Sequence, residues 1–116
     1  MIKFIEYPKC TTCIKAKKFL IENKVEFEDR HIVEDNPTKE ELLKWMDMSG
    51  LETKKFFNTS GKLYKEMALK DKVKDMDKEA AAELLSTNGM LVKRPILIKD
   101  EVVLVGFKED AYKEII

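Results

Sequence analysis

The stretch YPKCTTCIKA, at residues 7–16, joins two segments whose apolar residues follow different periods. The segment before it, IKFIE at residues 2–6, is short and rich in apolar residues, which is typical of a buried strand. The segment after it predicts an amphipathic helix to about Asn23, because its apolar residues recur at helical spacing: Cys13, Ala16, Phe19 and Leu20. The two cysteines therefore stand where a strand turns into a helix.

A Cys-x-x-Cys pair at such a junction predicts a thiol redox site. The unpaired N–H groups and the dipole at a helix start stabilise an anion, which lowers the pKa of a thiol. Cys10, at or just before the first turn, is the expected nucleophile, and Cys13, one turn later on the same face, is the expected resolving thiol. Lys9 adds a positive charge, and Thr11 and Thr12 add hydroxyl and N–H donors around the sulfur.

Two other interpretations of the cysteines stay open at this point. Free cysteines are often small buried core residues, and this pair fits a helix interior. The pair could also supply half of a zinc site completed by carboxylates or by a second chain. Two cysteines and one histidine cannot provide the four usual ligands of a structural zinc site alone, so no metal site is predicted.

Length and composition favour one compact domain over residues 1–116. The chain has 22 basic and 22 acidic residues, and its 44% apolar content is sufficient for a core. Zero net charge argues against binding nucleic acid by bulk electrostatics. No apolar run approaches the roughly 18 residues of a membrane span, and no signal peptide follows Met1. We therefore expect a cytoplasmic monomer with no membrane contact and no structural disulfide.

The next segments predict a second strand and a series of helices. Val25–Ile32 alternates and reads as a strand, which makes a parallel βαβ unit with the first strand and helix. Thr38–Glu41 fits a capping box, and Gly50 is a plausible helix end. Short helices are expected at Thr53–Phe57 and Tyr64–Leu69.

The last third of the chain returns to the strand period. The charged run Lys72–Lys78 predicts a solvated face, and Asp77 should cap a helix ending at Asn88-Gly89, whose buried face comprises Ala80, Ala81, Leu84 and Leu85. Pro95–Ile98 and Val102–Val105 predict a hairpin, and a final helix follows Glu109. The order β-α-β, helices, β-β-α by itself supports α/β or α+β. Together with the cysteine pair it predicts an α/β thioredoxin-like fold, with a mixed four-stranded sheet and a helical insertion at about residues 38–89.

Arg94-Pro95 opens the predicted hairpin. In a thioredoxin-like sheet, a proline at this point commonly has a cis bond and faces the cysteine loop, so that the backbone before it turns toward the site. The chain has only one other arginine, Arg30. A guanidinium can bind an oxyanion or a carboxylate bidentately. The alternative is a surface arginine before a strand proline.

Three segments resemble the arsenate reductase (ArsC)/Spx-like family, in the family's order: residues 7–16, residues 87–96 (TNGMLVKRPI) and residues 105–109 (VGFKE). Residues 57–61 (FNTSG) fit the reductase-like branch of the family. The resemblance spans nearly the whole chain. It implies a thioredoxin-like fold with a helical insertion.

For function, the resemblance implies that Cys10 attacks the substrate and that Arg94 holds it. Arsenate reductases of the family hold their oxyanion with three arginines, whereas this chain has no arginine from Thr59 to Lys62 and has Gly106 at the third position. Thr59 and Lys62 could line the site instead. We therefore expect a thiol–disulfide oxidoreductase with no bound cofactor, reduced by glutathione, glutaredoxin or thioredoxin.

Two alternatives follow from the same resemblance. The first is arsenate reduction with glutathione and glutaredoxin. The second is an Spx-type redox-sensing regulator that binds the RNA polymerase α subunit. Gly50 lies near the family position used for that contact, although it is equally an ordinary helix end. The charged C-terminal extension typical of those regulators is not present after Ile116.

Overall fold

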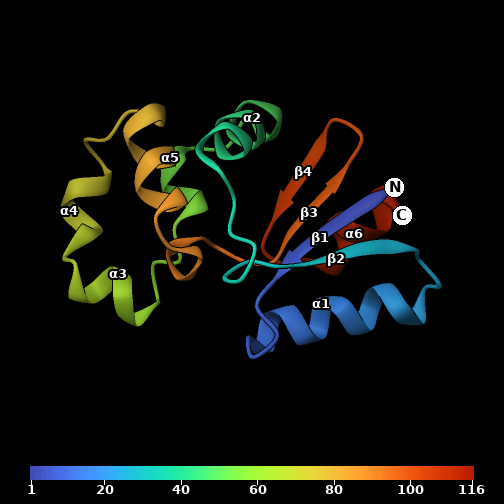
Figure 1. Cartoon of the computed structure of the whole chain (residues 1–116). Helices are drawn as coiled ribbons and strands as arrows, with labels where there is room; N and C mark the ends of the chain where they lie inside the picture. The colour runs from blue at the N-terminus through green and yellow to red at the C-terminus, as the bar shows by residue number, and fades with distance from the viewer.

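A mixed four-stranded sheet forms the centre of the molecule, as the sequence predicted. The computed structural model describes all 116 residues. Figure 1 shows the sheet, whose strands are β1 (Ile2–Glu6), β2 (Phe27–His31), β3 (Ile96–Lys99) and β4 (Val102–Val105). They lie in the order β2-β1-β3-β4; β1 pairs with β2 in parallel, and the other two pairs are antiparallel.

Helices cover both faces of this sheet. Helices α1 (Thr11–Glu22) and α6 (Glu109–Ile115) pack on one face, and α2 (Lys39–Ser49) and α5 (Lys78–Ser86) lie on the other (Figure 1). Because strand side chains alternate, Phe4 of β1 enters the α1 side of the core and Ile5 the other side, and both are fully buried. Strand β1 is therefore buried on both faces, and the cysteine loop that follows it starts from a rigid support.

The segment between β2 and β3 is helical. It contains η1 (Thr53–Phe56), α3 (Lys62–Glu66), α4 (Leu69–Val73) and η2 (Gly89–Leu91) besides α2 and α5. Figure 1 shows α3 and α4 away from the sheet, at the left of the view, beyond the start of α1. Gly89 seats η2 against the turn after β2, since a Cβ there would lie 2.0 Å from the Ile32 carbonyl oxygen. This close contact fixes the position of η2, which precedes Arg94 and β3 in the chain.

Local signals around α2 are confirmed. The Thr38 hydroxyl accepts a hydrogen bond from the Glu41 N–H, and the Glu41 carboxylate accepts one from the Thr38 N–H. Gly50 ends the helix with φ of 66°, a left-handed conformation that glycine adopts without strain. Asp77 likewise caps α5 through the Ala80 N–H.

Several predicted boundaries were wrong. The helix expected at Tyr64–Leu69 is two short helices, because Ala68 has a left-handed backbone with φ of 51°. The run Lys72–Lys78 is not simply a solvated face, since Val73 ends α4 and is buried at 2% exposure. The second strand is shorter than expected: Val25 donates to the Leu20 carbonyl in the turn before it.

The helix predicted to end at Asn88-Gly89 also differs. Helix α5 stops at Ser86, because the Thr87 hydroxyl and the Asn88 side chain bond to nearby backbone and start the 3-10 turn η2. The buried face of α5 is rotated relative to the prediction and consists of Ala81, Ala82 and Leu85. None of the helices in the chain has the length and apolar character needed to cross a membrane.

A buried carboxyl group marks the end of β1. Glu6 is only 2% exposed, and Lys17 of α1 lies 3.3 Å from its Oε2 atom. Lys17 also binds Asp29 of β2 at 2.7 Å. Burial raises the pKa of Glu6, the hydrogen bond to Asp29 raises it too, and Lys17 opposes both effects, so that the resulting pKa is about 7. Glu6 and Asp29 therefore share a proton beneath one ammonium group.

The raised pKa of Glu6 predicts an unusual pH dependence of stability. Folded Glu6 holds its proton up to about pH 7 and an unfolded one loses it near 4.5, so stability falls as pH rises through this window. The variant Glu6→Gln keeps the hydrogen bond to Asp29 and carries no charge. We expect it to exceed the parent's stability by about 2 kcal/mol at pH 8 and to match it at pH 5.

Urea unfolding at the two pH values measures this difference. Exposed Glu28 of the same strand as Asp29 provides the control, Glu28→Gln, which should leave the pH dependence unchanged. An equal effect of Glu6→Gln at both pH values would contradict the shared proton.

Candidate functional site

Cys10 is the N-cap residue of α1. Its backbone is extended, with φ of −81° and ψ of 123°, its N–H donates to the Tyr7 carbonyl at 2.9 Å, and its own carbonyl accepts from the Ile14 N–H at 3.0 Å. As the N-cap residue, Cys10 directly precedes the unpaired N–H groups of the first turn, which stabilise an anion at this place. Cys10 is half-buried and Cys13 fully buried, and both are free thiols.

The two thiols differ sharply in acidity. Burial opposes ionisation of Cys10, but the Cys13 N–H, the Cys13 thiol and the Arg94 guanidinium outweigh it and lower the pKa of Cys10. Burial raises the pKa of Cys13 to about 12; the Tyr7 N–H opposes this rise, and the neighbouring Cys10 adds to it. The shifts therefore favour the thiolate form of Cys10 and the protonated form of Cys13.

Arg94 reaches Cys10 from across the fold. The Arg94-Pro95 bond is cis, as the sequence predicted. The Arg94 Nη1 atom donates to the Met90 carbonyl at 3.2 Å, and its Cζ atom lies 5.2 Å from the centroid of the Tyr7 ring. This cation–π contact and the hydrogen bond hold the guanidinium at the start of β3.

His31 supports the other side of the Tyr7 ring. The two rings meet edge to face, with centroids 5.8 Å apart and planes at 87°. The Nδ1 atom of His31 accepts hydrogen bonds from the N–H groups of Val33 and Glu34, which fixes the imidazole in the turn after β2. Sequence reasoning gave no role to Tyr7; the only local signal was an aromatic residue next to Pro8 at the strand end.

A pocket of about 300 Å³ lies on the side of Arg94 that faces the helical insertion. Asn58 and Lys62 line it together with Arg94 and Met90. Lys62 is 89% exposed at its side chain and pairs only with Glu66, at 3.7 Å. Glu66 lines the same pocket, so the charge of Lys62 is balanced there, and Arg94 is the cation of the pocket that has no carboxylate partner.

Some predicted residues do not join this arrangement. Thr59 is exposed and lines a hollow with Lys93 that is separate from the pocket lined by Asn58 and Arg94. Thr11 and Thr12 are exposed and their hydroxyl groups make no hydrogen bond. Lys9 is exposed and forms no ion pair. The roles proposed for these four residues remain predictions.

The structure brings together Cys10, Cys13 and Arg94, and Pro95 follows Arg94 directly in the chain. Near Gly106, where the family resemblance placed a third arginine, the Cε atom of Lys93 lies 3.8 Å from the position of a Cβ. No three His, Cys, Asp or Glu side chains converge as metal ligands.

A mixed sheet of this topology, with two thiols at the start of the first helix and a cis-proline before the third strand, defines a thioredoxin-like protein. Residues 5–115 match the model of the ArsC family, and the chain belongs to that family, which includes Spx-like members.

Three relatives illustrate the similarity. The chain is 50% identical to the Bacillus subtilis (strain 168) protein YusI over 113 residues, covering 97% of this chain and 96% of YusI. It is 32% identical to the global transcriptional regulator Spx of Streptococcus agalactiae serotype V, covering 95% of this chain and 79% of Spx. The crystal structure of an ArsC family related protein from Bacteroides fragilis superposes with a TM-score of 0.94 at 53% identity, covering 97% and 95% of the two chains.

The first prediction for the site concerns Arg94. Replacement of Arg94 by Met removes the guanidinium that stabilises the thiolate, so the pKa of Cys10 should rise toward its usual value of 9.0. The pH dependence of alkylation by iodoacetamide measures this pKa, because only the thiolate reacts. Lys93→Met removes a neighbouring cation that is not among the groups acting on Cys10 and should leave the pKa unchanged. Equal shifts in both variants would contradict a specific role of Arg94.

The second prediction concerns the Tyr7 ring. Tyr7→Leu keeps the backbone contacts to both cysteines and removes the surface on which Arg94 lies. We expect the pKa of Cys10 to move in the same direction as in Arg94→Met, but by less, because the Met90 hydrogen bond remains. Tyr7→Phe keeps the ring and should retain the parent pKa. A double variant, Tyr7→Leu with Arg94→Met, should show no further shift, since both changes act through one guanidinium.

Proposed function

We propose that this chain is a thiol–disulfide oxidoreductase in which Cys10 is the nucleophile and Cys13 the resolving thiol. The observation that carries the proposal is the opposite perturbation of two thiols one helical turn apart: the pKa of Cys10 is lowered and that of Cys13 is raised. A difference in pKa of this kind suits thiol–disulfide exchange, because the attacking sulfur must be anionic while the resolving thiol stays protonated until the mixed disulfide has formed. Membership of the ArsC family supports a reductase-like activity.

The reaction proceeds in two exchanges. The Cys10 thiolate attacks one sulfur of a substrate disulfide, a new S–S bond forms to Cys10, and the other half leaves as a thiolate. The negative charge of Cys10 is then gone, which removes one of the influences that raise the pKa of Cys13. Cys13 loses its proton to solvent and attacks Cys10, which expels the second substrate thiolate and leaves a Cys10–Cys13 disulfide.

A reductant must return two electrons to that disulfide. Two molecules of glutathione, or the dithiol of glutaredoxin or thioredoxin, supply them by the reverse exchange. The pocket beside Arg94 favours a substrate or reductant with an anionic group, because Arg94 lines it and is paired with no carboxylate, whereas Lys62 is paired with Glu66. Soluble redox partners of this kind are consistent with a chain that has no membrane-spanning helix.

Turnover of glutathione disulfide and of small mixed disulfides tests the proposal. Cys10→Ser should abolish turnover, while Cys13→Ser should retain the first exchange and accumulate a mixed disulfide on Cys10, visible as added mass in intact-protein mass spectrometry. The parent protein should form the internal disulfide instead. If Cys10→Ser and Cys13→Ser lose alkylation and turnover to the same extent, the assignment of nucleophile and resolving thiol is wrong.

A second candidate is a redox-sensing regulator of the Spx type, which would bind the RNA polymerase α subunit. Two observations favour it: the 32% identity to Spx, and the exposed helix end at Gly50, which has no atom within 4 Å of a Cβ position. Capture of the purified α subunit by the dithiol and by the disulfide form tests it. Binding that differs between the two forms and is lost in Gly50→Arg supports the regulator, and no complex with either form excludes it.

Arsenate reduction has weaker support from the site. Of the three arginine positions of the family's arsenate reductases, only Arg94 is an arginine, while Lys62 and Lys93 lie near the other two. A lysine offers a point charge and cannot bind an oxyanion bidentately. Arsenite formation that depends on both Cys10 and Arg94 is the result that would restore this candidate.

A further inference from the structure

Helix α1 exposes two large apolar side chains on one face. Ile14 is 54% exposed and Ile21 is 60% exposed. They are seven residues apart, two helical turns, and so lie in one stripe, while the core face of α1 is formed by Cys13, Ala16, Phe19 and Leu20. Ile14 follows Cys10 by a single turn, and its N–H binds the Cys10 carbonyl. The apolar stripe therefore begins next to the nucleophile.

The two isoleucines line a groove of about 510 Å³. Its other lining residues are Pro8, from the turn before Cys10, and two pairs of opposite charge, Lys17 with Glu6 and Lys18 with Glu22. Lys17 turns inward to Glu6 and Asp29, at 3.3 Å and 2.7 Å, so its charge is balanced inside the fold. The groove thus has an apolar lining, the charge of Lys17 beneath it is balanced, and its near end lies at the turn that leads into Cys10.

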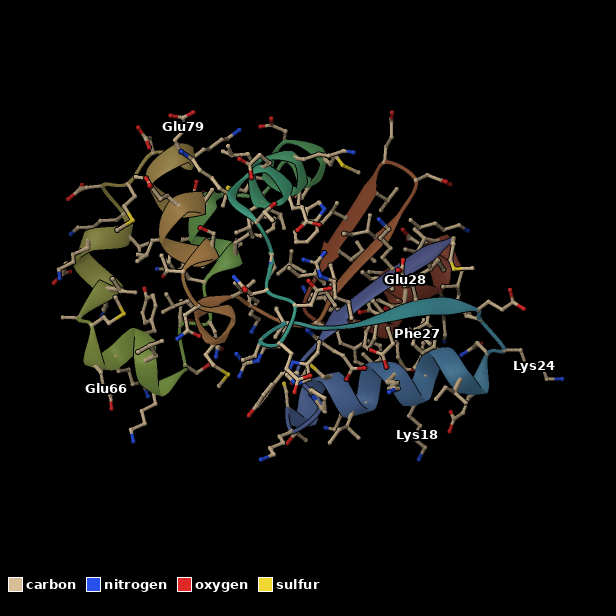
Figure 2. The ribbon with its side chains drawn as sticks, in the orientation of Figure 1. Lys18, Lys24, Phe27, Glu28, Glu66 and Glu79 are labelled. Atoms are coloured by element: carbon tan, nitrogen blue, oxygen red, sulfur yellow. The ribbon has the colours of Figure 1, made fainter.

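The unpaired charges beside the near end of the groove are positive. Between Tyr7 and Ile21 the ionisable residues other than the cysteines and Tyr7 are Lys9, Lys15, Lys17 and Lys18, and the first acidic residue of α1 is Glu22. Lys9 and Lys15 form no ion pair, and Lys18 pairs only with Glu22, at 3.9 Å and with both side chains exposed. Figure 2 shows Lys18 projecting from α1 away from the sheet. In a chain of zero net charge, this surface is locally basic.

We propose that this groove is the docking site for a protein substrate, and that it holds an extended segment with apolar and acidic side chains next to the cysteine that exchanges with Cys10. The inference rests on the proposed thiol–disulfide exchange and adds its partner class. A mixed disulfide on Cys10 fixes the partner's backbone at the start of α1, so the chain flanking the partner's cysteine must lie over neighbouring surfaces, of which this groove is apolar and open.

The length of the groove and the charges around it indicate which kind of partner segment fits. Ile14 and Ile21 are separated by about 10 Å at 1.5 Å per helical residue, a distance that about three residues of extended chain cover. Apolar side chains of an extended segment at least this long would contact the two isoleucines, and acidic residues nearer its cysteine would meet Lys9 and Lys18. A small disulfide such as glutathione disulfide has no chain long enough to reach Ile21.

Kinetics with two substrates separates docking from chemistry. Ile21→Gln and Ile21→Glu should lower kcat/KM about tenfold for a disulfide-containing peptide that bears leucines and aspartates beside its cysteine, since burial of an isoleucine is lost. Neither should change kcat/KM for glutathione disulfide or the pKa of Cys10. Val102→Gln, an equally conservative change at an exposed apolar residue of β4, should leave both substrates unaffected.

A charge exchange tests the acidic component. Lys18→Glu should weaken turnover of the aspartate-bearing peptide and improve that of a matched lysine-bearing peptide. If Ile21 and Lys18 variants process every peptide like the parent, the groove is not the docking site. If instead Ile21→Gln converts a dimer to a monomer in sedimentation experiments, a second copy of the chain covers the groove and the proposal is overturned.

A binding measurement keeps this inference independent of the activity. The same peptide with serine in place of cysteine cannot exchange, and its binding to the parent protein should perturb the amide NMR signals of residues 14–21. If no disulfide is turned over and the peptide still binds there, the proposed function fails and the docking site stands. If turnover is normal and no signal shifts, the docking site fails and the function stands.

Discussion

A half-buried thiol with a lowered pKa is the constraint on which the arrangement of this molecule depends. Burial of the Cys10 sulfur opposes its ionisation, and the fold must supply donors that compensate for the lost water. The Cys13 N–H does so because Cys10 is the N-cap of α1, and Arg94 does so from the start of β3. The first donor comes from the helix itself, whereas the second must be brought from more than eighty residues away.

The pairing of the strands places Arg94 beside the cysteine loop. Strand β1 carries the cysteine loop at one end and pairs with β3 along its length, so the residue that precedes β3 lies beside that loop. Tyr7 then contributes to both parts of the site: its backbone contacts the two cysteines, and its ring supports the Arg94 guanidinium. His31, held by the turn after β2, supports the ring from the other side. Three strand ends thus meet at one charged group.

The α1 surface shows a second use of the same helix. Its inner face is core, its N-terminus activates the thiol, and its outer face leaves two isoleucines in water beside the basic turn. Lys17 connects the outer face with the interior by balancing Glu6 and Asp29, whose shared proton lets a carboxyl group be buried at the end of β1. Neutralisation inside and positive charge outside together make the surface suited to an acidic, apolar chain.

Residues 7–16 were sufficient to locate the two thiols and to predict unequal roles for them. The strand end, the turn and the helix start are local features, which the sequence indicates through Pro8 and through the helical spacing of the apolar residues that follow. The capping box at Thr38 and the end at Gly50 were equally local and equally clear. The sequence pattern was misleading where tertiary contacts override it, as at Val73, which lies in a run of charges and is nevertheless core. Only the tertiary structure decided three features of the site: the contacts of His31 and Arg94 with the Tyr7 ring, the pocket beside Arg94, and the exclusion of Thr59 from that pocket. These contacts join residues that are distant in the chain, so they depend on the register of the sheet and on where η2 packs.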